Sequence, residues 1–309
     1  MQLQFERFMG SLVGLAVGDA LGTTVEFSTP GKFKPVEDMV GGGVFQLQAG
    51  EWTDDTSMAL CLAESLIESG GFDPVDQMRR YAKWRYEGYL SSTGKCFDIG
   101  NATAESINLF RRTGEGYCGS TNPNAAGNGS IMRLCPIPLY YAADPKQAIH
   151  YSALSSKTTH AGEECVDACR LMASYILAGL HGWPREKMLE PSAFDEWLNQ
   201  KPLAPRVADI LAGSYKEKEP PDIQGSGYVV KSLEAALWAF YKSDDFEQGA
   251  LMAVNLGDDA DTTGAVYGQI AGAYYGVDGI PEKWRNKLAM KTLIVGFAES
   301  LYHRAASLR

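Results

Sequence analysis

Two series of glycines with the same spacing constrain the fold of this chain more than any other feature. In each series a glycine recurs at every fourth position, at 10, 14, 18 and 22 and again at 264, 268, 272 and 276. Glycine inside a helix costs up to about 1 kcal/mol relative to alanine, and residues i and i+4 share one helix face. We therefore predict two buried central helices whose backbones approach closely. Breaks of one or both series into turns are the alternative.

An acidic cluster stands directly before the second glycine series. Residues 255–265 read N-L-G-D-D-A-D-T-T-G-A and carry the carboxylates of Asp258, Asp259 and Asp261. Carboxylates this close repel one another unless a positive charge lies among them. Mg²⁺ and Mn²⁺ are the cations that prefer such oxygen ligands. Helix capping by these residues is the alternative.

A second acidic cluster, T-D-D-T at residues 53–56, precedes a segment with the apolar periodicity of a helix. Two clusters far apart in the sequence, each at a helix start, can meet in space. Together they would offer six oxygen-bearing side chains, from Thr53, Asp54, Asp55, Asp259, Asp261 and Thr262. Such a set suits two bridged divalent cations roughly 3.5–4 Å apart.

Composition narrows the function classes. The formal net charge is −10 and no run of Lys or Arg occurs, which argues against nucleic-acid or anionic-membrane binding. Six cysteines without a C-x-x-C motif, and four histidines, predict free thiols in a reducing cytosol rather than zinc or disulfides. Residues 1–6 do not resemble a signal peptide. The weakly polar segment 264–277 is too short to span a membrane, which takes about 20 residues.

The remaining apolar periodicity predicts helices, and no segment alternates as a strand would. Helices are expected after residue 53 and over residues 73–89, 102–111, 144–154, 163–180, 229–241 and 284–308, with short helices over 183–221. Asp73 is the expected cap of its helix, with Pro74 at the first position. The glycine-rich segments 31–50 and 116–130 are expected to be loops. We predict an all-α protein, a helical bundle forming one domain over residues 1–309, with the metal centre at helix N-termini.

Several polar residues outside the acidic clusters are candidates for a site. Asp19 lies in the first glycine-containing helix, where a buried acid either pairs or serves a site. Glu26 follows that helix as a candidate ligand, general base or surface acid. Asp98 and Asn101 both stand at the start of the helix expected over 102–111, and capping accounts for only one of them.

Two further segments carry candidate binding groups. G-N-G-S at residues 127–130 offers successive backbone N–H groups, and such a nest at a helix start binds anions. His160 precedes the helix over 163–180, where a cap, a substrate contact and a core position are all open interpretations.

The joint pattern of these motifs resembles the ADP-ribosylglycohydrolase family, in the family's order and over nearly the whole chain. The segments are G-D-A-L-G at 18–22 followed by Glu26, W-T-D-D-T at 52–56, D-I-G-N at 98–101, G-N-G-S-I-M-R at 127–133, T-H at 159–160, G-S-G-Y at 225–228 and D-A-D-T at 259–262. The D-I-G-N segment most resembles the dinitrogenase reductase-activating glycohydrolase branch, which hydrolyses ADP-ribosylarginine.

The resemblance implies an all-helical fold with a dinuclear Mg²⁺ or Mn²⁺ centre. The implied ligands are the six oxygen-bearing side chains of the two acidic clusters. Many relatives read G-G-D-T-D-T where residues 257–262 of this chain read G-D-D-A-D-T. Asp258 and Ala260 are therefore departures from the pattern, and both ligand aspartates remain. The additional Asp258 either strengthens metal binding or points to solvent.

The resemblance also implies removal of ADP-ribose from a modified arginine of a protein, so that an ADP-ribosylated protein is the partner and ADP-ribose the product. Catalytic roles are implied for Glu26, which positions or deprotonates water, for Asp98, which pairs with the arginine guanidinium, and for Asp261. Substrate-binding roles are implied for Asp98, Asn101, Gly127, Asn128, Gly129, Ser130, His160 and Tyr228. The glycine-rich segment would hold the pyrophosphate, and Tyr228 would stack on adenine.

Two alternatives remain open at this point. One is a hydrolase of another linkage, such as ADP-ribosyl-serine or O-acetyl-ADP-ribose, although Asp98 favours arginine. The other is a non-catalytic ADP-ribose-binding or crystallin-like protein, which should lack intact metal ligands, whereas all six are present here. We expect a cytoplasmic monomer.

Overall fold

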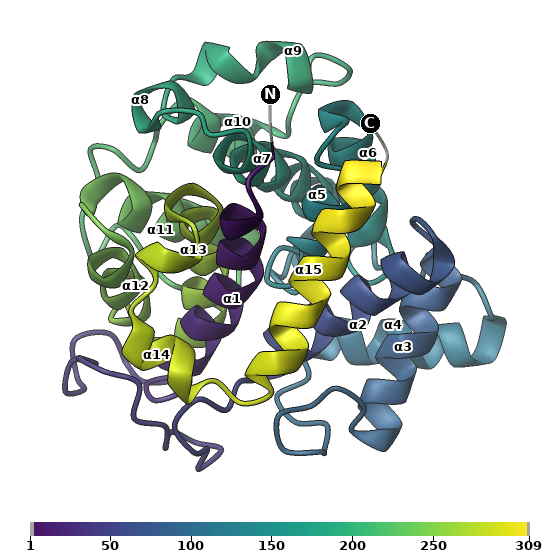
Figure 1. Ribbon diagram of the computed structural model, residues 1–309, viewed down its shortest axis with the longest axis horizontal. Helices are drawn as coiled ribbons and strands as arrows, with labels where there is room; N and C mark the ends of the chain where they lie inside the picture. The colour runs from purple at the N-terminus through teal and green to yellow at the C-terminus, as the bar shows by residue number, and fades with distance from the viewer. Residues whose placement is uncertain (1–2, 308–309) are drawn as a thin grey trace.

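The computed structural model describes residues 3–307, and its regular structure is helical (Figure 1). The longer helices are α1 (Phe5–Gly22), α2 (Asp54–Ser69), α3 (Pro74–Glu87), α4 (Asn101–Thr113), α6 (Pro145–Lys157), α7 (Glu163–Leu180), α11 (Val229–Lys242), α12 (Phe246–Val254), α13 (Ala260–Tyr275) and α15 (Lys291–Ser307). The shorter ones are α5 (Pro136–Tyr140), α8 (Arg185–Met188), α9 (Asp195–Leu198), α10 (Pro205–Leu211) and α14 (Glu282–Lys287). Strand pairing in the described part of the chain is limited to isolated bridges. The predicted all-α class is confirmed.

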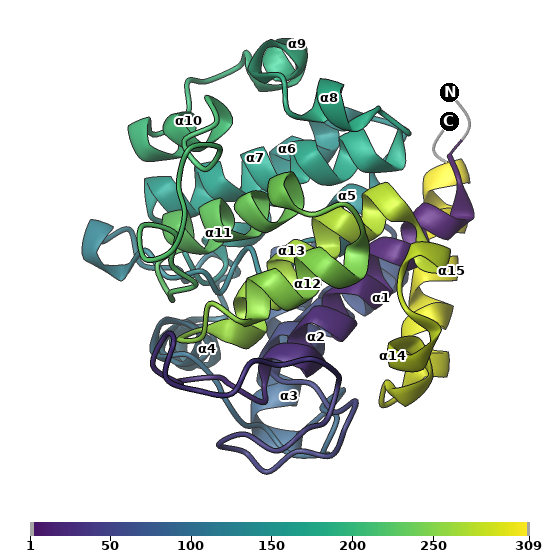
Figure 2. The same ribbon diagram turned by 90° about the vertical axis from the view of Figure 1, so that its left-hand side faces the viewer.

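Apart from Gly276, which ends α13 as its C-cap, the glycines of the two series lie on the helices α1 and α13. These helices pack against each other in antiparallel directions at the centre of the molecule (Figure 2). A methyl group added to Gly14 would overlap the carbonyl oxygen of Gly268, and one added to Gly268 would overlap that of Gly14. The pairs 10/272 and 18/264 repeat this reciprocal contact. The predicted close approach of two buried helices is confirmed, and the alternative of turns is wrong for both series.

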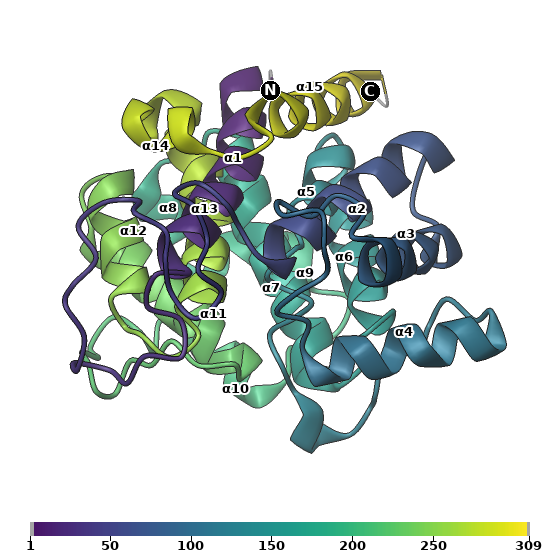
Figure 3. The ribbon, with the colours of Figure 1, turned by 90° about the horizontal axis from the view of Figure 1, so that it is seen from below.

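The remaining helices cover this central pair. Helices α7, α11 and α12 pack against α13, while α2 and α15 pack against α1. Figure 3 shows α2, α3 and α4 on one side of α1 and the helix α12 on the other. A smaller apolar cluster, which includes Met58, Tyr81 and Trp84, fills the space on the α2 side. The central pair therefore joins the two halves of the protein on which the candidate residues stand.

Local sequence signals account for most of the helix boundaries. The carboxylate of Asp73 caps α3 by accepting hydrogen bonds from the N–H groups of Val75 (2.9 Å) and Asp76 (3.1 Å), with Pro74 at the first position. Helix α7 has both predicted ends. The helix α12 was not among the expected elements, since it is short and includes a glycine, Gly249.

The structure corrects one expectation, because the single helix expected over 284–308 is two helices. Helices α14 and α15 are separated at residues 288–290, where Met290 takes a φ of +54°. Hydrogen bonds from the loop before α2 stabilise the residues between the two helices. The Gly50 carbonyl accepts a hydrogen bond from the N–H of Ala289 (2.9 Å), and the Trp52 indole N–H donates to the Ala289 carbonyl (3.1 Å). Residue 308 lies outside the described residues.

All six cysteines are free thiols, and five of them are buried. Within residues 3–307, no helix has both the length and the apolar character needed to cross a bilayer. The main hydrophobic core includes residues from Leu3 to Ala305. Organisation as one domain stays a prediction.

The contact between α1 and α13 can be tested with a single methyl group. We expect Gly14→Ala to lower the free energy of unfolding by roughly 3 kcal/mol, because the new methyl group meets backbone that cannot move aside. Gly296→Ala is the matched control, since Gly296 lies in the helix α15 with open space around it. The control should raise stability by up to about 1 kcal/mol. Urea unfolding of the two variants measures both effects, and equal stabilities would contradict the argument.

Candidate active site

The two acidic clusters meet in space. Helix α2 begins at the first cluster and the helix α13 at the second. The hydroxyl oxygen of Thr53 lies 3.1 Å from Asp261 Oδ2 and 3.2 Å from Asp55 Oδ2. Thr262 Oγ1 lies 3.4 Å from Asp55 Oδ2. Side chains from opposite ends of the chain therefore form one buried oxygen cluster.

Asp19 performs the capping that α2 needs at its N-terminus. Its Oδ1 accepts hydrogen bonds from the N–H and the hydroxyl of Thr53, each at 2.9 Å. Its Oδ2 accepts from the N–H (3.0 Å) and the hydroxyl (2.6 Å) of Thr56. These bonds replace the usual N-cap side chain, so the carboxylates of Asp54 and Asp55 are not used for capping. Of the two expectations for Asp19, pairing within the structure is the one observed.

The arrangement around Thr53 fits a divalent cation. The Thr53 hydroxyl has one proton but lies within 3.2 Å of carboxylate oxygens from Asp19, Asp55 and Asp261. Contacts that this proton does not bridge bring oxygen lone pairs close together, which a cation would relieve. Three buried carboxylate oxygens also lack a hydrogen-bond partner among residues 3–307: Glu26 Oε2, Asp55 Oδ1 and Asp261 Oδ1. Buried polar atoms without partners are rare in folded proteins. The donor set, carboxylates with threonine hydroxyls, is the type that Mg²⁺ and Mn²⁺ prefer.

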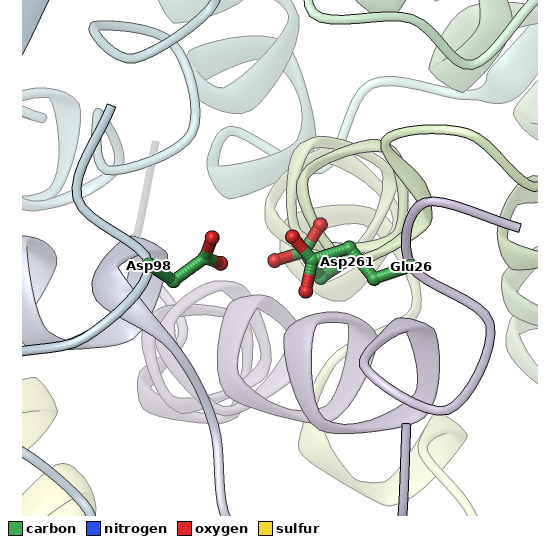
Figure 4. Close-up of side chains that lie close together, drawn as sticks. All are labelled: Glu26, Asp98 and Asp261. Carbon is green, nitrogen blue, oxygen red and sulfur yellow. The ribbon is translucent and has the colours of Figure 1, made fainter. Parts of the chain in front are cut away.

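Asp261 belongs to two groups of carboxylates that could each hold a metal ion. Asp54, Asp55 and Asp261 place one oxygen each within 4.8 Å of one another, and Glu26, Asp98 and Asp261 do the same. Figure 4 shows the carboxylates of the second group pointing toward one another. A shared carboxylate between two such groups is the arrangement expected for bridged cations.

Burial and mutual repulsion disfavour the ionised forms of these acids. Burial, followed by the charge of Asp98, raises the pKa of Glu26 to about 10. Burial raises the pKa of Asp98 to about 7. The pKa values of Asp54, Asp55 and Asp261 lie well above the usual range, first because of burial and then because of neighbouring carboxylates. A bound cation would stabilise the ionised forms instead.

A cavity of about 400 Å³ opens above this oxygen cluster. Asp98 and Asn101 line it together with Glu26. Neither Asp98 nor Asn101 caps α4, since the N-cap position is Gly100 and no side chain bonds to the helix start. Asp98 itself takes a φ of +59°, a costly conformation that persists mainly where function or packing requires it. Both side chains are therefore available to a ligand.

The glycine-rich segment 127–130 lines the opposite wall, but not as the sequence predicts. No helix begins after it, because residues 129–133 form a turn and α5 begins at Pro136. The Asn128 N–H donates to the Gly227 carbonyl (3.0 Å), and the Gly127 N–H donates to a neighbouring carbonyl (2.9 Å). Among the described residues, the N–H groups of Gly129 and Ser130 have no such partner. The anion cradle is thus reduced to two N–H groups, because those of Gly127 and Asn128 already donate to backbone carbonyls outside the turn.

Other members of the predicted binding set lie around this wall. Gly127, Asn128, Gly129 and His160 line the cavity, whereas Ser130 is buried beneath it. Tyr228 lies just beyond the lining residue Gly227, and its hydroxyl donates to Glu164 Oε2 (2.6 Å) and accepts from Arg206 Nη1 (3.0 Å). The ring is therefore fixed at the edge of the cavity.

The orientation of His160 follows from a hydrogen-bonded chain that sequence reasoning missed. Arg133 Nη2 donates to the hydroxyl oxygen of Thr159 (2.7 Å), which lies 2.8 Å from His160 Nδ1. Because arginine can only donate, the Thr159 proton is left for Nδ1. His160 therefore carries its own proton on Nε2, and its ring lies against Gly127 and Gly129. Burial, followed by the Arg133 charge, lowers the pKa of His160 to about 3, so the ring is neutral at physiological pH.

Arg133 and Gln269 hold the glycine-rich wall in place. Arg133 is 1% exposed, donates to the Gly129 carbonyl (2.9 Å), and forms no ion pair with any described residue. Gln269, from the helix α13, donates to the Met132 carbonyl (2.7 Å) and accepts from the Cys135 N–H (2.8 Å). The sequence carried a signal for each residue: Arg133 ends the G-N-G-S-I-M-R segment, and Gln269 is a polar residue within an apolar helix. Neither signal specified which groups the side chain would bind.

The last pair of acids, Asp258 and Asp259, have different surroundings. Asp258 is exposed with a φ of +55°, and its N–H donates to the Ser28 carbonyl (2.8 Å). Of the two expectations for Asp258, pointing to solvent is the one observed. Asp259 lines the cavity, and its Oδ2 accepts a hydrogen bond from Asn128 Nδ2 (2.7 Å). It lies outside the two carboxylate groups that share Asp261.

The fold and the cavity together define an all-helical hydrolase-type site, in which clustered carboxylates face a glycine-rich wall. Residues 1–308 match the family described as ADP-ribosylglycohydrolase. The chain belongs to this family, and the resemblance predicted from its motifs is confirmed.

Individual relatives agree with the family assignment. The chain is 44% identical to ADP-ribosylarginine hydrolase Tri1 of Pseudomonas putida (strain GB-1), over 97% of this chain and 79% of that protein. It is 34% identical to ADP-ribosyl-[dinitrogen reductase] glycohydrolase of Rhodospirillum rubrum, over 93% and 91%. A solved structure titled ADP-ribosylglycohydrolase-related protein complex superimposes with a TM-score of 0.86 at 41% identity, over 97% of this chain and 98% of that one. Similarity to the arginine hydrolase is thus higher than to the dinitrogen reductase enzyme.

Metal binding should counteract a loss of stability that the metal-free protein undergoes as the pH rises. The pKa values of Asp98 (about 7) and Glu26 (about 10) lie above the unfolded values of about 4. The folded metal-free protein therefore binds more protons than the unfolded chain, and its stability falls as pH rises from about 4 through 7 toward 10. With chelator present, we expect a lower unfolding temperature at about pH 8.5 than at about pH 5.5. Mn²⁺ or Mg²⁺ should stabilise the protein more at the higher pH, and equal stabilisation at both would contradict this.

The protonation of His160 can be observed directly. We expect ¹⁵N NMR to show a neutral ring protonated at Nε2 from about pH 5 to 8, since burial lowers the pKa of His160 to about 3. Thr159→Val should remove this preference between the two ring nitrogens. Thr158→Val is the control, because Thr158 is equally buried and also accepts from Arg133 but forms no hydrogen bond with His160. A charged ring at pH 6, or a tautomer unchanged in Thr159→Val, would refute the hydrogen-bonded chain.

Proposed function

We propose that this chain is a metal-dependent hydrolase that removes ADP-ribose from a modified arginine side chain of a protein. The observation that carries the proposal is the position of Asp261, shared by two carboxylate groups at the base of a cavity with a glycine-rich wall. The names of similar proteins, an ADP-ribosylarginine hydrolase and an ADP-ribosyl-[dinitrogen reductase] glycohydrolase, support this activity. The monomeric state stays a prediction.

Two divalent cations, Mg²⁺ or Mn²⁺, are the proposed cofactors. Their proposed ligands are the six side chains predicted from the sequence: Thr53, Asp54, Asp55, Asp259, Asp261 and Thr262. Asp261 would be the shared ligand, because it alone belongs to both carboxylate groups. When bound, the cations would supply Lewis acidity and a template for the ribose hydroxyls. Asp19 would keep its four hydrogen bonds to the start of α2 and so hold the ligands in register.

The two carboxylates toward the mouth of the cavity have the proposed catalytic tasks. Asp98 lines the cavity without a capping role and would pair with the guanidinium of the target arginine, because carboxylates bind guanidinium groups in a favourable geometry. This pairing favours arginine over an uncharged serine linkage. Glu26 would position a water molecule and accept its proton as the C–N bond between ribose and arginine breaks. The water oxygen then joins the ribose carbon, and the leaving nitrogen recovers a proton.

The glycine-rich wall would bind the rest of ADP-ribose. The N–H groups of Gly129 and Ser130 and the Nε2–H of His160 are the proposed donors to the pyrophosphate, which a neutral histidine binds by hydrogen bonding rather than by charge. The buried charge of Arg133 behind Gly129 would favour an anion on that side of the wall. Asn101 would bind the substrate beside Asp98. Tyr228, fixed by Glu164 and Arg206, would provide an apolar face for adenine at the cavity edge.

The proposal predicts that activity depends on Asp261 but not on its neighbour Asp258. Asp261→Asn should reduce release of ADP-ribose from an arginine-modified protein at least about a hundredfold, since it weakens both carboxylate groups at once. Asp258→Asn is the matched control. It removes one charge three residues away, at an exposed position, and asparagine tolerates the positive φ.

The assay uses each protein with Mn²⁺ or Mg²⁺ and again with chelator, and measures free ADP-ribose. Chelator should abolish the release by wild-type protein. Turnover that persists in chelator, or equal loss in the two variants, would rule out the proposed metal-dependent site.

A further inference from the structure

Three phenylalanine rings form a continuous row beside the active site. We call Phe27, Phe45 and Phe97 the aromatic rim. The ring centroids of Phe27 and Phe45 lie 6.5 Å apart, and those of Phe45 and Phe97 lie 5.2 Å apart. These separations are typical of aromatic pairs. The rim joins three segments that are distant in the sequence, so it is a product of the fold.

The aromatic rim lies at the mouth of the cavity. Phe27 follows Glu26 directly, and Phe97 precedes Asp98 directly. The carboxylates of Glu26 and Asp98 belong to one close group, and Phe27 is among the residues that line the cavity. Phe45 connects the two ends of the row from the loop between α1 and α2. The aromatic rim therefore adjoins the cavity through Phe27 and adjoins Asp98 through Phe97.

The rim is partly exposed, although burial would favour it. Phe27 is 62% exposed, Phe45 and Phe97 are half-buried, and Val44, beside Phe45, is 58% exposed. Of the seven large apolar side chains that stand exposed in the described part of the chain, three come from residues 27–44. An apolar patch of this kind on a soluble protein marks a surface that another molecule covers. Phe27 also takes a φ of +57°, a strained conformation for a bulky residue.

Backbone and side-chain hydrogen bonds hold the rim in this position. The Phe27 N–H donates to the Asp258 carbonyl at 2.7 Å. The Thr24 hydroxyl donates to the Gly41 carbonyl at 3.0 Å, which attaches the loop of Phe45 to the segment after α1. The Ser92 hydroxyl donates to the Trp52 carbonyl at 2.6 Å, which attaches the loop of Phe97 to the start of α2. The three rings are thus presented on supported backbone.

We propose that the aromatic rim is the docking surface for the polypeptide that carries the ADP-ribosylated arginine. This inference rests on the proposed function, because it assigns the protein part of the same substrate. The occupant follows from continuity with the cavity: if the arginine guanidinium pairs with Asp98, the polypeptide around that arginine must lie against Phe97, Phe45 and Phe27. Its recognised chemistry is an apolar or aromatic side chain next to the modified arginine.

Charge supports an apolar contact at this surface. The chain has a formal net charge of −10, and Glu26, Asp98 and Asp261 gather at the cavity. The negative charge at the mouth would therefore repel acidic partner proteins, and ion pairs there would form only with basic ones. Aromatic contacts do not depend on the charge of the partner, and aromatic residues are enriched in protein interfaces.

The test compares a protein substrate with a small one. One substrate is a protein bearing ADP-ribose on a surface arginine, and the other is ADP-ribosylated arginine as the free amino acid. For Phe45→Ala we expect the ratio of kcat/KM for the protein to kcat/KM for the small substrate to fall about tenfold, mainly through KM for the protein. Phe45 is the chosen position because it does not line the cavity. Phe45→Leu should retain most of the ratio.

Tyr86→Ala is the matched control, since Tyr86 is an aromatic side chain of α3, 47% exposed and outside the cavity. It should leave the ratio as in wild type. An unchanged ratio in Phe45→Ala, with or without a loss common to both substrates, would overturn the docking surface while leaving the proposed function in place. If the wild-type protein with metal releases ADP-ribose from neither substrate, the proposed function fails and the docking surface fails with it.

Discussion

The direct backbone contact between α1 and α13 is the constraint on which the site depends. Glycines on both helices let the carbonyl groups of one chain segment touch the Cα atoms of the other, and no side chain separates them. The contact extends to the residue Gly22, which packs against the backbone of Ala260 and Asp261. The position of Asp261 is therefore fixed to α1 as well as to its own helix. Glycines lower the stability of the two helices, but the close contact that they permit fixes the positions of the carboxylates.

The same helix α1 also fixes the other half of the oxygen cluster. Asp19 caps α2 from outside by accepting from the N–H groups of Thr53 and Thr56, so that the carboxylates of Asp54 and Asp55 are not used as caps. Burial of so many acids raises their pKa values and leaves three oxygens without partners. These buried acids therefore lower the stability of the metal-free protein, and a bound cation would raise it again. Local destabilisation of this kind is common at functional sites.

Periodic and capping signals made much of this structure predictable. The glycine series predicted the central pair, and the two acidic helix starts predicted the cluster around Asp261. The last helix was predicted without its break, because Met290 carries no turn signal and its conformation depends on contacts with the distant loop of Gly50 and Trp52. The glycine-rich wall was predicted as a helix start, whereas no helix follows it and two of its four N–H groups donate to the carbonyls of Ala125 and Gly227. Arg133 gave no signal of its function because its partners come from segments that only the fold assembles.

Asp19 has one more consequence. Its bonds to Thr53 and Thr56 set the register of α2 against α1 without reference to the residues in between. The part of the connecting segment around Phe45, beyond Glu26 and Phe27, can therefore change its length or sequence during evolution while the proposed metal ligands keep their spacing. Relatives that share the same chemistry can in this way diverge in the partner proteins that they accept.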